Sequence, residues 1–564
     1  MEKQSSSKGF TILSAASIIT KLLGVLYVPI YTLILGNYGN GIYEQGFKIY
    51  QLVFVIANTG MPIALSKIIS EQLASEKYLL SYRTLRISTV MLTVAGLVTS
   101  VSMALLAMPL ANMMYSPEAY LTILALSPAM IFTAIGCIYR GYFQGRSNMV
   151  PTSISQIIEQ AVNCALTILF AWVMYKYGVN VAAVKGITDQ EEIFKVAAVY
   201  AAAGATIGTT AGAMASTLYL LRTYHKNRND ILKEIKLTEV SGQRASNKEI
   251  VKKILSYAIP VTLGSVLIYA TQIIDVMNIK TRLMTAGFTD FEATSMYGIL
   301  STQYNKVLFI PVAFATALQT AILPSISAAH ALNDRALLHR RIYRSFKTIL
   351  MIVVPAAIGI AVMAKPIINI LFPRYPDGWD LLMIGSWTLV LISLVSIQTS
   401  ILQGIGKVYV PTIHMIIGLV LKLIVNYTLI AVKPINIKGA IIGNAVCYIF
   451  AAFMNYRAIK RHTGVRLSVK RLFNRPLSVS VIMGLIVYLV YHGSTLMAGW
   501  LIKSLFIQNL ICSCFAIAAG MLVYYLLMIM AKGLTADDIR SFPMGGRILD
   551  FTARVPIVDR YLKL

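Results

Sequence analysis

The amino-acid sequence predicts an all-α polytopic membrane protein with about 14 transmembrane helices, arranged as two parallel six-helix repeats and two extra C-terminal helices. Of the 564 residues, 57% are hydrophobic and only 13% are charged, whereas soluble proteins carry roughly 25% charged residues. Apolar runs of about 17 to 25 residues, the length that crosses a bilayer core of roughly 30 Å, recur along the whole chain. The two halves of the chain also repeat each other. Together these observations exclude a soluble enzyme.

The expected spans follow from apolar runs bounded by glycine, proline and charged residues. The first apolar run continues past the core of a signal peptide without an obvious cleavage site, so we expect it to remain as the first span. The predicted spans begin near Phe10, Glu44, Leu85, Ala119, Val150, Phe194, Ile250, Thr294, Ile342, Asp380, Val408, Ile437, Leu477 and Ser504.

The basic residues predict the orientation of these spans. If the N-terminus is inside, 35 of the 50 Lys and Arg residues fall in cytoplasmic segments, 10 in external segments and 5 within spans. This distribution follows the positive-inside rule, so we expect a plasma-membrane protein with both termini in the cytoplasm. Because the basic residues are shared out loop by loop, the net charge of +27 does not indicate a nucleic-acid partner.

A shift of about 258 residues brings the two halves into register. Each half has six predicted spans, an even number, so the units must be parallel repeats with a central cleft, as in transporters that rock one bundle against the other. The first half has about 25 extra residues around the expected external loop 176–195. The matched segments include Leu65-Ser66-Lys67-Ile68 with Leu323-Pro324-Ser325-Ile326, Arg83 and Arg86 with Arg341 and Arg344, and Val150-Pro151-Thr152 with Val410-Pro411-Thr412.

The repeat divides the chain into five parts. We expect an N-terminal six-helix lobe over residues 1–223, a basic cytoplasmic linker over 224–249 and a C-terminal six-helix lobe over 250–462. Two additional transmembrane helices occupy 463–532, and an amphipathic cytoplasmic tail occupies 533–564.

Charged residues within predicted spans are candidate functional residues, because a charge at mid-bilayer costs several kcal/mol. Lys48 and Lys306 occupy equivalent repeat positions. We expect four lysines to form a cationic, substrate-binding cavity: Lys21, Lys48, Lys306 and Lys422. The acidic residues Glu159, Asp275 and Glu44 are either counter-ions or sites for a coupling ion, Na⁺ or H⁺. Glu44 and Lys67 lie near span ends, where their side chains can reach the membrane interface.

A surplus of lysines in a cleft favours an anionic substrate such as a phosphate or diphosphate. Four arginines, Arg83, Arg86, Arg140 and Arg146, lie on the expected cytoplasmic rim, either as a funnel for that anion or as topology signals. The five cysteines have no spacing typical of a metal or disulfide framework. We therefore expect no metal site and no cofactor.

Three segments resemble signatures of the stage V sporulation protein B group, which belongs to the multidrug/oligosaccharidyl-lipid/polysaccharide (MOP) exporter superfamily and includes Gram-positive relatives of the lipid II flippases. The likeness covers essentially the whole chain. The segments are Arg140-Gly141-Tyr142-Phe143-Gln144-Gly145-Arg146-Ser147-Asn148-Met149-Val150-Pro151-Thr152 with Ser155-Gln156-Ile157-Ile158-Glu159-Gln160, Gly60-Met61-Pro62-Ile63-Ala64-Leu65-Ser66-Lys67 with Ser70-Glu71, and Thr20-Lys21-Leu22-Leu23-Gly24.

The resemblance implies a V-shaped pair of lobes, a groove for a lipid tail beside the two extra helices, and transport of a lipid-linked cell-wall oligosaccharide, lipid II above all, in peptidoglycan or spore cortex synthesis. It also implies that Lys21, Lys48 and Lys306 are counterparts of basic cavity residues that are commonly arginine. Lysine cannot bind a phosphate bidentately, so another prenyl-diphosphate-linked substrate stays open. Membrane lipids are expected partners, and cell-wall polymerases are left open.

Three other functions are considered beside this one. A multidrug cation antiporter of the same superfamily would favour acidic residues in the cleft and about twelve spans. A membrane glycosyltransferase would need an acid, histidine or metal site in a sizeable external loop. The longest expected external loop offers only Asp189, Glu191 and Glu192, and the histidines His330, His339 and His414 lie in or near cytoplasmic segments or a span. A scaffold for a cell-wall or spore-envelope complex would transport nothing.

Overall fold

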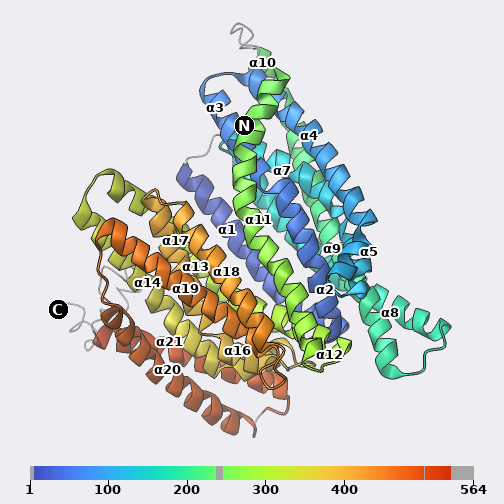
Figure 1. Ribbon diagram of the computed structural model, residues 1–564, viewed down its shortest axis with the longest axis vertical. Helices are drawn as coiled ribbons and strands as arrows, with labels where there is room; N and C mark the ends of the chain where they lie inside the picture. Colours follow the sequence, from blue (N-terminus) through green and yellow to red (C-terminus); the bar gives the residue numbers. More distant parts are fainter. Residues whose placement is uncertain (1–5, 237–245, 501, 532, 535–564) are drawn as a thin grey trace. The chain divides into compact units, whose positions relative to one another are not determined.

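The computed structural model describes residues 6–236, 246–500, 502–531 and 533–534, and the chain forms two compact units, Met1–Ser301 and Thr302–Leu564 (Figure 1). Within the described ranges all regular structure is helical. The first unit contains α1 Ser6–Leu26, α2 Val28–Asn58, α3 Gly60–Ala74, α4 Tyr78–Leu105, α5 Ala107–Met113, η1 Pro117–Ala119, α6 Tyr120–Leu126, α7 Ala129–Gly145, α8 Val150–Val184, α9 Gln190–Lys226, α10 Arg228–Lys236, α11 Asn247–Thr285 and α12 Asp290–Gly298.

A π-helical turn, η2 Ile299–Tyr304, contains the boundary between the two units. The second unit continues with α13 Asn305–Ala331, α14 Arg335–Val362, α15 Ala364–Leu371, α16 Trp379–Gly385, α17 Thr388–Gly404, α18 Tyr409–Leu429, α19 Lys438–Thr463, α20 Val469–Ala498 and α21 Leu505–Met530.

Nine described helices are long and apolar enough to cross a membrane, and two bent helix pairs raise the number to eleven if each pair is one span. This confirms an all-α polytopic membrane protein, but it does not confirm the predicted count of 14. The other three predicted spans, those starting near Phe10, Ile250 and Thr294, fall on α1, α11 and α12–α13.

The two bent pairs occupy equivalent positions in the sequence repeat. Helices α6 and α7 meet at 41° and helices α16 and α17 at 46°, and α7 and α17 each have 17 residues. At both bends a serine hydroxyl donates to a carbonyl three residues earlier, Ser127 to Leu124 at 2.8 Å and Ser386 to Met383 at 3.0 Å. The internal repeat is therefore also a repeat of local structure.

The extra residues of the first half form a helical hairpin instead of the expected loop 176–195. Helix α8 has 35 residues against 21 in its counterpart α18, and α9 has 37 against 26 in α19. The two helices are joined by only a short turn, after which the side chain of Asp189 caps α9 by accepting from the Glu192 amide at 3.3 Å. A 35-residue helix is about 52 Å long, so the hairpin projects beyond the neighbouring helices of its unit (Figure 1).

Helix α2 contains one residue that is not helical. Gly36 has φ 63° and ψ −175°, a conformation essentially confined to glycine because it has no Cβ. The break separates residues 28–35 from residues 37–58, so the polypeptide changes direction between the first two predicted spans.

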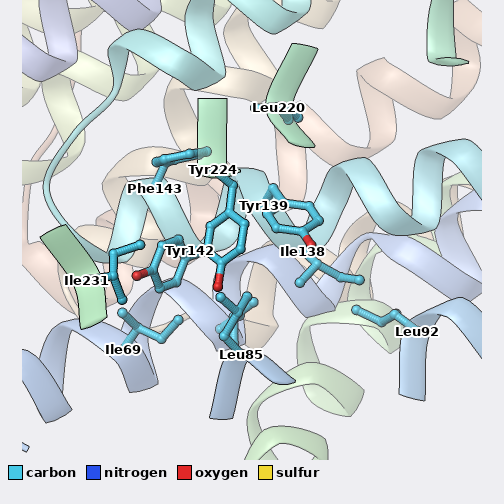
Figure 2. Close-up of a cluster of buried hydrophobic side chains, with 11 residues drawn as sticks. Ile69, Leu85, Leu92, Ile138, Tyr139, Tyr142, Phe143, Leu220, Tyr224 and Ile231 are labelled. Atoms are coloured by element: carbon cyan, nitrogen blue, oxygen red, sulfur yellow. The ribbon is translucent and has the colours of Figure 1, made fainter. Parts of the chain in front are cut away.

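An aromatic and aliphatic cluster holds four long helices of the first unit together. Tyr139 and Tyr142 of α7 pack their rings 5.1 and 5.8 Å from the ring of Tyr224 on α9. Figure 2 shows these tyrosines beside Ile69 of α3 and Leu85 of α4. Burying several large side chains at about 25 cal/mol per Å² fixes the end of α7, which carries two of the candidate arginines.

Side-chain hydrogen bonds connect α21, one of the two predicted extra helices, to α14 and α20 of the second unit. The Tyr524 hydroxyl donates to the Met351 carbonyl of α14 at 2.8 Å, and the Tyr491 hydroxyl of α20 donates to Asn509 at 2.5 Å. Beyond α21, Leu534 is buried against this bundle. The rest of the predicted cytoplasmic tail lies outside the described residues. Within the predicted linker, residues 228–236 form α10, and residues 237–245 lie outside the described residues.

Candidate functional site

Helix α2 carries one of the predicted cavity lysines and an acidic residue one turn away. The Lys48 ammonium lies 3.9 Å from the Glu44 carboxylate and donates to Gln51 at 3.3 Å. The Lys48 side chain is 22% exposed, whereas that of Glu44 is 3% exposed. The Lys48 ammonium is therefore held within its own helix and remains partly exposed.

Lys21 of α1 is exposed, and the described part of the chain offers it no hydrogen bond or ion pair. Helix α1 packs on α8, where Gly24 lies against the side-chain amide of Gln160. Lys21 is therefore an uncompensated cation within an apolar helix.

The two remaining cavity lysines and Asp275, a predicted counter-ion or ion-coupling residue, are each half-buried. Lys306 is the second residue of α13 and Lys422 lies in α18, both in the second unit, whereas Asp275 lies in α11 of the first unit. Lys67 of α3 is exposed and stacks its ammonium 4.1 Å from the ring centre of Tyr257, a cation–π contact. The assignment of the four lysines to a cavity, and of Asp275 to a counter-ion or ion-coupling role, stays a prediction.

Glu159 is part of a four-residue cluster that joins α7, α8 and α9. Arg140 pairs with the Glu159 carboxylate and also donates to the hydroxyls of Ser155 at 3.1 Å and Ser216 at 3.0 Å. Ser216 in turn donates to Glu159 at 3.2 Å. The counter-ion of Glu159 is thus an arginine assigned to the rim, not one of the lysines.

The remaining rim arginines differ in their surroundings. Arg146 donates from one guanidinium nitrogen, Nη2, to both carboxylate oxygens of Glu234 in α10, at 2.8 and 2.5 Å, and its guanidinium lies over the ring of Tyr142. Arg83 donates to Asn247 at the start of α11 at 2.8 Å, and Arg86 is exposed. Arg146 is therefore a structural contact between α7 and α10, while Arg86 is open to solvent.

A buried lysine that the sequence analysis passed over lies at the C-terminal end of α11. Lys280 is 0% exposed, pairs with Asp290 at 2.7 Å and donates to the Ser116 hydroxyl at 3.1 Å. Ser116 donates onward to Gln45 of α2. The signal was present in the sequence, because Lys280 shares a helix face with the buried apolar residues Val276 and Leu283.

The second unit contains a counterpart of the Gln45 contact. Gln303 is aligned with Gln45 by the shift of 258 residues, and both side chains are fully buried. Gln45 binds Ser116 in the segment between α5 and α6, and Gln303 donates to the Tyr375 carbonyl at 2.9 Å and accepts from the Gly378 amide at 2.7 Å between α15 and α16. Each repeat therefore anchors its second helix with one glutamine.

The described residues bring no three His, Cys, Asp or Glu side chains together in a way that could hold a metal ion. Of the histidines considered for catalysis, His414 contacts Asn455 at 2.8 Å and His339 contacts the Thr463 carbonyl at 2.8 Å. The residues Asp189, Glu191 and Glu192, which were the candidates for an external catalytic acid, lie at the start of the α9 hairpin, where Asp189 is a helix cap. All of these contacts stabilise local structure.

The family model described as "Polysaccharide biosynthesis protein" matches residues 6–330, more than half of the chain. The chain belongs to this family. Two curated relatives of this family member come from Bacillus subtilis (strain 168). The lipid II flippase MurJ is 27% identical over 499 residues, 86% of this chain and 88% of the relative, and stage V sporulation protein B is 23% identical over 97% of this chain and 100% of the relative.

Solved structures share the fold of this polysaccharide biosynthesis family member. The lipid II flippase MurJ in its inward closed conformation matches with a TM-score of 0.63 and 16% identity over 92% of this chain and 98% of that structure. An inward-facing multidrug resistance MATE family transporter of the MOP superfamily matches with a TM-score of 0.59 and 16% identity over 78% of this chain and 95% of that structure. The MurJ relative and both solved structures are named as flippases or a transporter. The chain is a multi-pass membrane protein with the same fold.

Proposed function

We propose that this protein is a flippase that moves a lipid-linked cell-wall oligosaccharide precursor, specifically lipid II, from the inner to the outer leaflet of the plasma membrane, with both termini in the cytoplasm. The observation that carries the proposal is the match to the Bacillus subtilis lipid II flippase over 86% of this chain and 88% of that protein. The match covers most of the length of both proteins, so it is not confined to one segment of the chain.

The charges of the chain support an anionic substrate. Lys21 has no protein partner among the described residues, and the side chain of Lys48 is 22% exposed. Lys306 repeats the position of Lys48 in the second half. An ammonium binds phosphate as a point charge, so these lysines suit the diphosphate of a prenyl carrier. An inside-negative membrane potential favours outward movement of each negative charge by about 2.3 kcal/mol per 100 mV.

A coupling ion, Na⁺ or H⁺, would bind at Asp275 or Glu44 under this proposal. Glu159 is a poorer candidate because Arg140 already neutralises it, and an ion would have to displace the guanidinium. Bonds are neither made nor broken during transport, so the mechanism needs no cofactor. Association with cell-wall polymerases is a further part of the proposal, because these enzymes use the flipped precursor.

Binding tests the substrate class directly. We expect native mass spectrometry of the detergent-purified protein to show preferential binding of lipid II and undecaprenyl diphosphate over an organic cation. The variant Lys48→Ala/Lys306→Ala should lose this preference. Lys67→Ala is the matched control, because Lys67 is an exposed lysine stacked on Tyr257, and it should bind as the wild type does.

Transport in cells tests the function. Lys48→Ala/Lys306→Ala should fail to support growth of cells depleted of their own lipid II flippase, while the protein still reaches the membrane in normal amount. Full rescue by this variant would contradict the role of the two lysines.

A multidrug cation antiporter is the second candidate, because a MATE transporter shares the fold at a TM-score of 0.59. The uncompensated Lys21 disfavours it, since a cation in the cleft would be repelled. Binding of the organic cation alone in the same mass-spectrometric titration would favour this function over flipping.

A further inference from the structure

Helix α11 presents two different faces near its N-terminal end. On one face, Ile250 and Ile254 are buried and pack with Ile68 of α3. At the same end, Lys253 pairs with Glu71 of α3 at 2.8 Å. This face fixes α11 to the first unit, so a ligand at this end of the helix can bind only on the other face.

The other face of α11 carries two lysines followed by aliphatic side chains. Lys248 and Lys252 are both exposed, and at four residues apart they are neighbours on the helix surface. Val251 and Leu255 are half-buried, and Ile259, one turn further along, is 51% exposed. We name these five residues the α11 lysine face. Its charge lies at the end of the helix, and its apolar side chains lie further in.

The α11 lysine face borders an open hollow of about 580 Å³. Ligand pockets in proteins have volumes of about 300–1,000 Å³. Two further residues of α11 line the hollow, and both are already bonded: Asn247 accepts from Arg83 at 2.8 Å, and the Ser256 hydroxyl donates to the Lys253 carbonyl at 2.8 Å. The two lysines are therefore the polar groups that the hollow offers to a ligand.

Lys248 and Lys252 make no ion pair or hydrogen bond within the described part of the chain. The acid between them, Glu249, is directed to the end of the helix, where it accepts from the Ser246 amide at 3.0 Å in a capping box. A positive charge in the first turn of a helix opposes the helix dipole, so Lys248 does not stabilise α11. Two such cations are suited to bind an anion from outside the protein.

The position of the lysines along α11 indicates a lipid anion. The predicted span begins near Ile250, so Lys248 and Lys252 lie at its start, where lysine side chains keep their ammonium groups at the membrane surface. From Lys252 to Ile259 the helix extends about 10 Å further, and Leu255 and Ile259 give this stretch an apolar surface. Charge followed by apolar surface matches a lipid with an anionic head and an apolar chain.

We propose that the α11 lysine face binds the prenyl diphosphate of the substrate, with the two ammonium groups on the diphosphate and the start of the prenyl chain on Val251, Leu255 and Ile259. The inference rests on the proposed function, and it adds a site for the lipid carrier to the four predicted cavity lysines. Lysine binds phosphate as a point charge, and two neighbouring lysines can contact both phosphates of one diphosphate. A phospholipid with a single phosphate gains less from the pair, so the site selects the carrier.

Photo-cross-linking in lipid nanodiscs tests the site in the full-length protein. The photoreactive residue p-benzoylphenylalanine replaces Ile259 in one sample and Val98 of α4 in another, because Val98 is also apolar and is 56% exposed. The discs contain phosphatidylglycerol with a small fraction of undecaprenyl diphosphate, and mass spectrometry identifies the adducts. We expect the ratio of prenyl to phosphatidylglycerol adducts to be about fivefold higher at Ile259, which corresponds to about 1 kcal/mol.

The variant Lys248→Gln/Lys252→Gln should abolish this enrichment. Lys226→Gln/Lys233→Gln is the matched control, because it removes the same charge from two exposed lysines of α9 and α10 in the same unit, and it should keep the enrichment. Both variants should melt at the temperature of the wild type, since neither removes an ion pair or hydrogen bond among the described residues. Inorganic diphosphate in excess should not lower the enrichment, because it has no chain for the aliphatic residues to bind.

Three results would overturn the site: equal adduct ratios at Ile259 and Val98, an equal loss in the two lysine variants, or competition by inorganic diphosphate. The native mass-spectrometric titration separates this failure from failure of the proposed function. If lipid II binds in a way that depends on Lys48 and Lys306 but Ile259 shows no enrichment, only the α11 site is wrong. If lipid II does not bind but the enrichment persists, the α11 site stands and the flipping of lipid II is contradicted.

Discussion

At the scale of single residues, backbone geometry and buried polar contacts determine local features that hydropathy does not predict. Gly36 adopts φ 63° and ψ −175° within an otherwise helical segment. Lys280 and Gln45 are fully buried although both are polar. The sequence carried signals for these contacts, because Gln45 and Gln303 are identical under the repeat shift. The sequence gives no such signal for the partners Ser116 and Asp290. They lie in or beside connecting segments, and only the folded chain shows that they reach the buried groups.

The break in α2 leads to a prediction at one residue. Gly36→Ala should lower the stability of the protein by about 1–3 kcal/mol, because the new Cβ cannot adopt the backbone conformation of Gly36 without strain. Thermal unfolding of the purified protein in detergent measures the effect. Gly493→Ala is the control, since this helical glycine has no heavy atom within 4 Å of the added Cβ and alanine favours a helix. Equal melting temperatures for the two variants would contradict the assigned role of Gly36.

At the scale of helices, most element positions followed from apolar runs. The predicted starts Val150 and Ile437 lie at or next to the observed starts of α8 and α19, Val150 and Lys438. The hairpin of α8 and α9 was mistaken for a loop because its tip is polar, while its residues still favour helix. The bends between α6 and α7 and between α16 and α17 could not be read from hydropathy, since both segments of each pair are apolar.

The ion pair between α7 and α8 gives a prediction at this scale. Glu159→Gln and Arg140→Gln should each lower the stability by about 1–2 kcal/mol, because each weakens or removes charge-assisted hydrogen bonds in a partly buried cluster. Arg140→Lys should retain only part of the lost stability, since a lysine ammonium cannot bind Ser155 and Glu159 together as a planar guanidinium does. Thermal unfolding reads out these changes, with the exposed Arg86→Gln as control.

The same pair distinguishes the two roles considered for Glu159. If Glu159 binds a coupling ion, Glu159→Gln should alter the Na⁺ or pH dependence of transport and leave the melting temperature unchanged. A lower melting temperature with unaltered ion dependence is the outcome expected from the contacts of Arg140.

At the scale of the whole molecule, the two sequence repeats share one helical plan, and the two halves of the chain differ in what is added to it. The first unit has the long α8–α9 hairpin, and the second has α20 and α21 attached through Tyr524 and Asn509. The orientation of this plan in the membrane rests on the predicted distribution of 35 internal and 10 external basic residues. The orientation determines on which side of the membrane the α8–α9 hairpin projects.

Epitope tags at the two ends of α9 test the orientation. Gly186 lies in the turn before α9, has φ +70° and has no atom within 4 Å of an added Cβ, so a tag inserted there should not disturb packing. Asn227 lies between α9 and α10, at the other end of the same helix. We expect antibody to stain the Gly186 tag on intact cells and the Asn227 tag only after permeabilisation, because a spanning helix must place its ends on opposite sides. The opposite staining would reverse the topology, and with it the direction in which the proposed cycle carries its substrate.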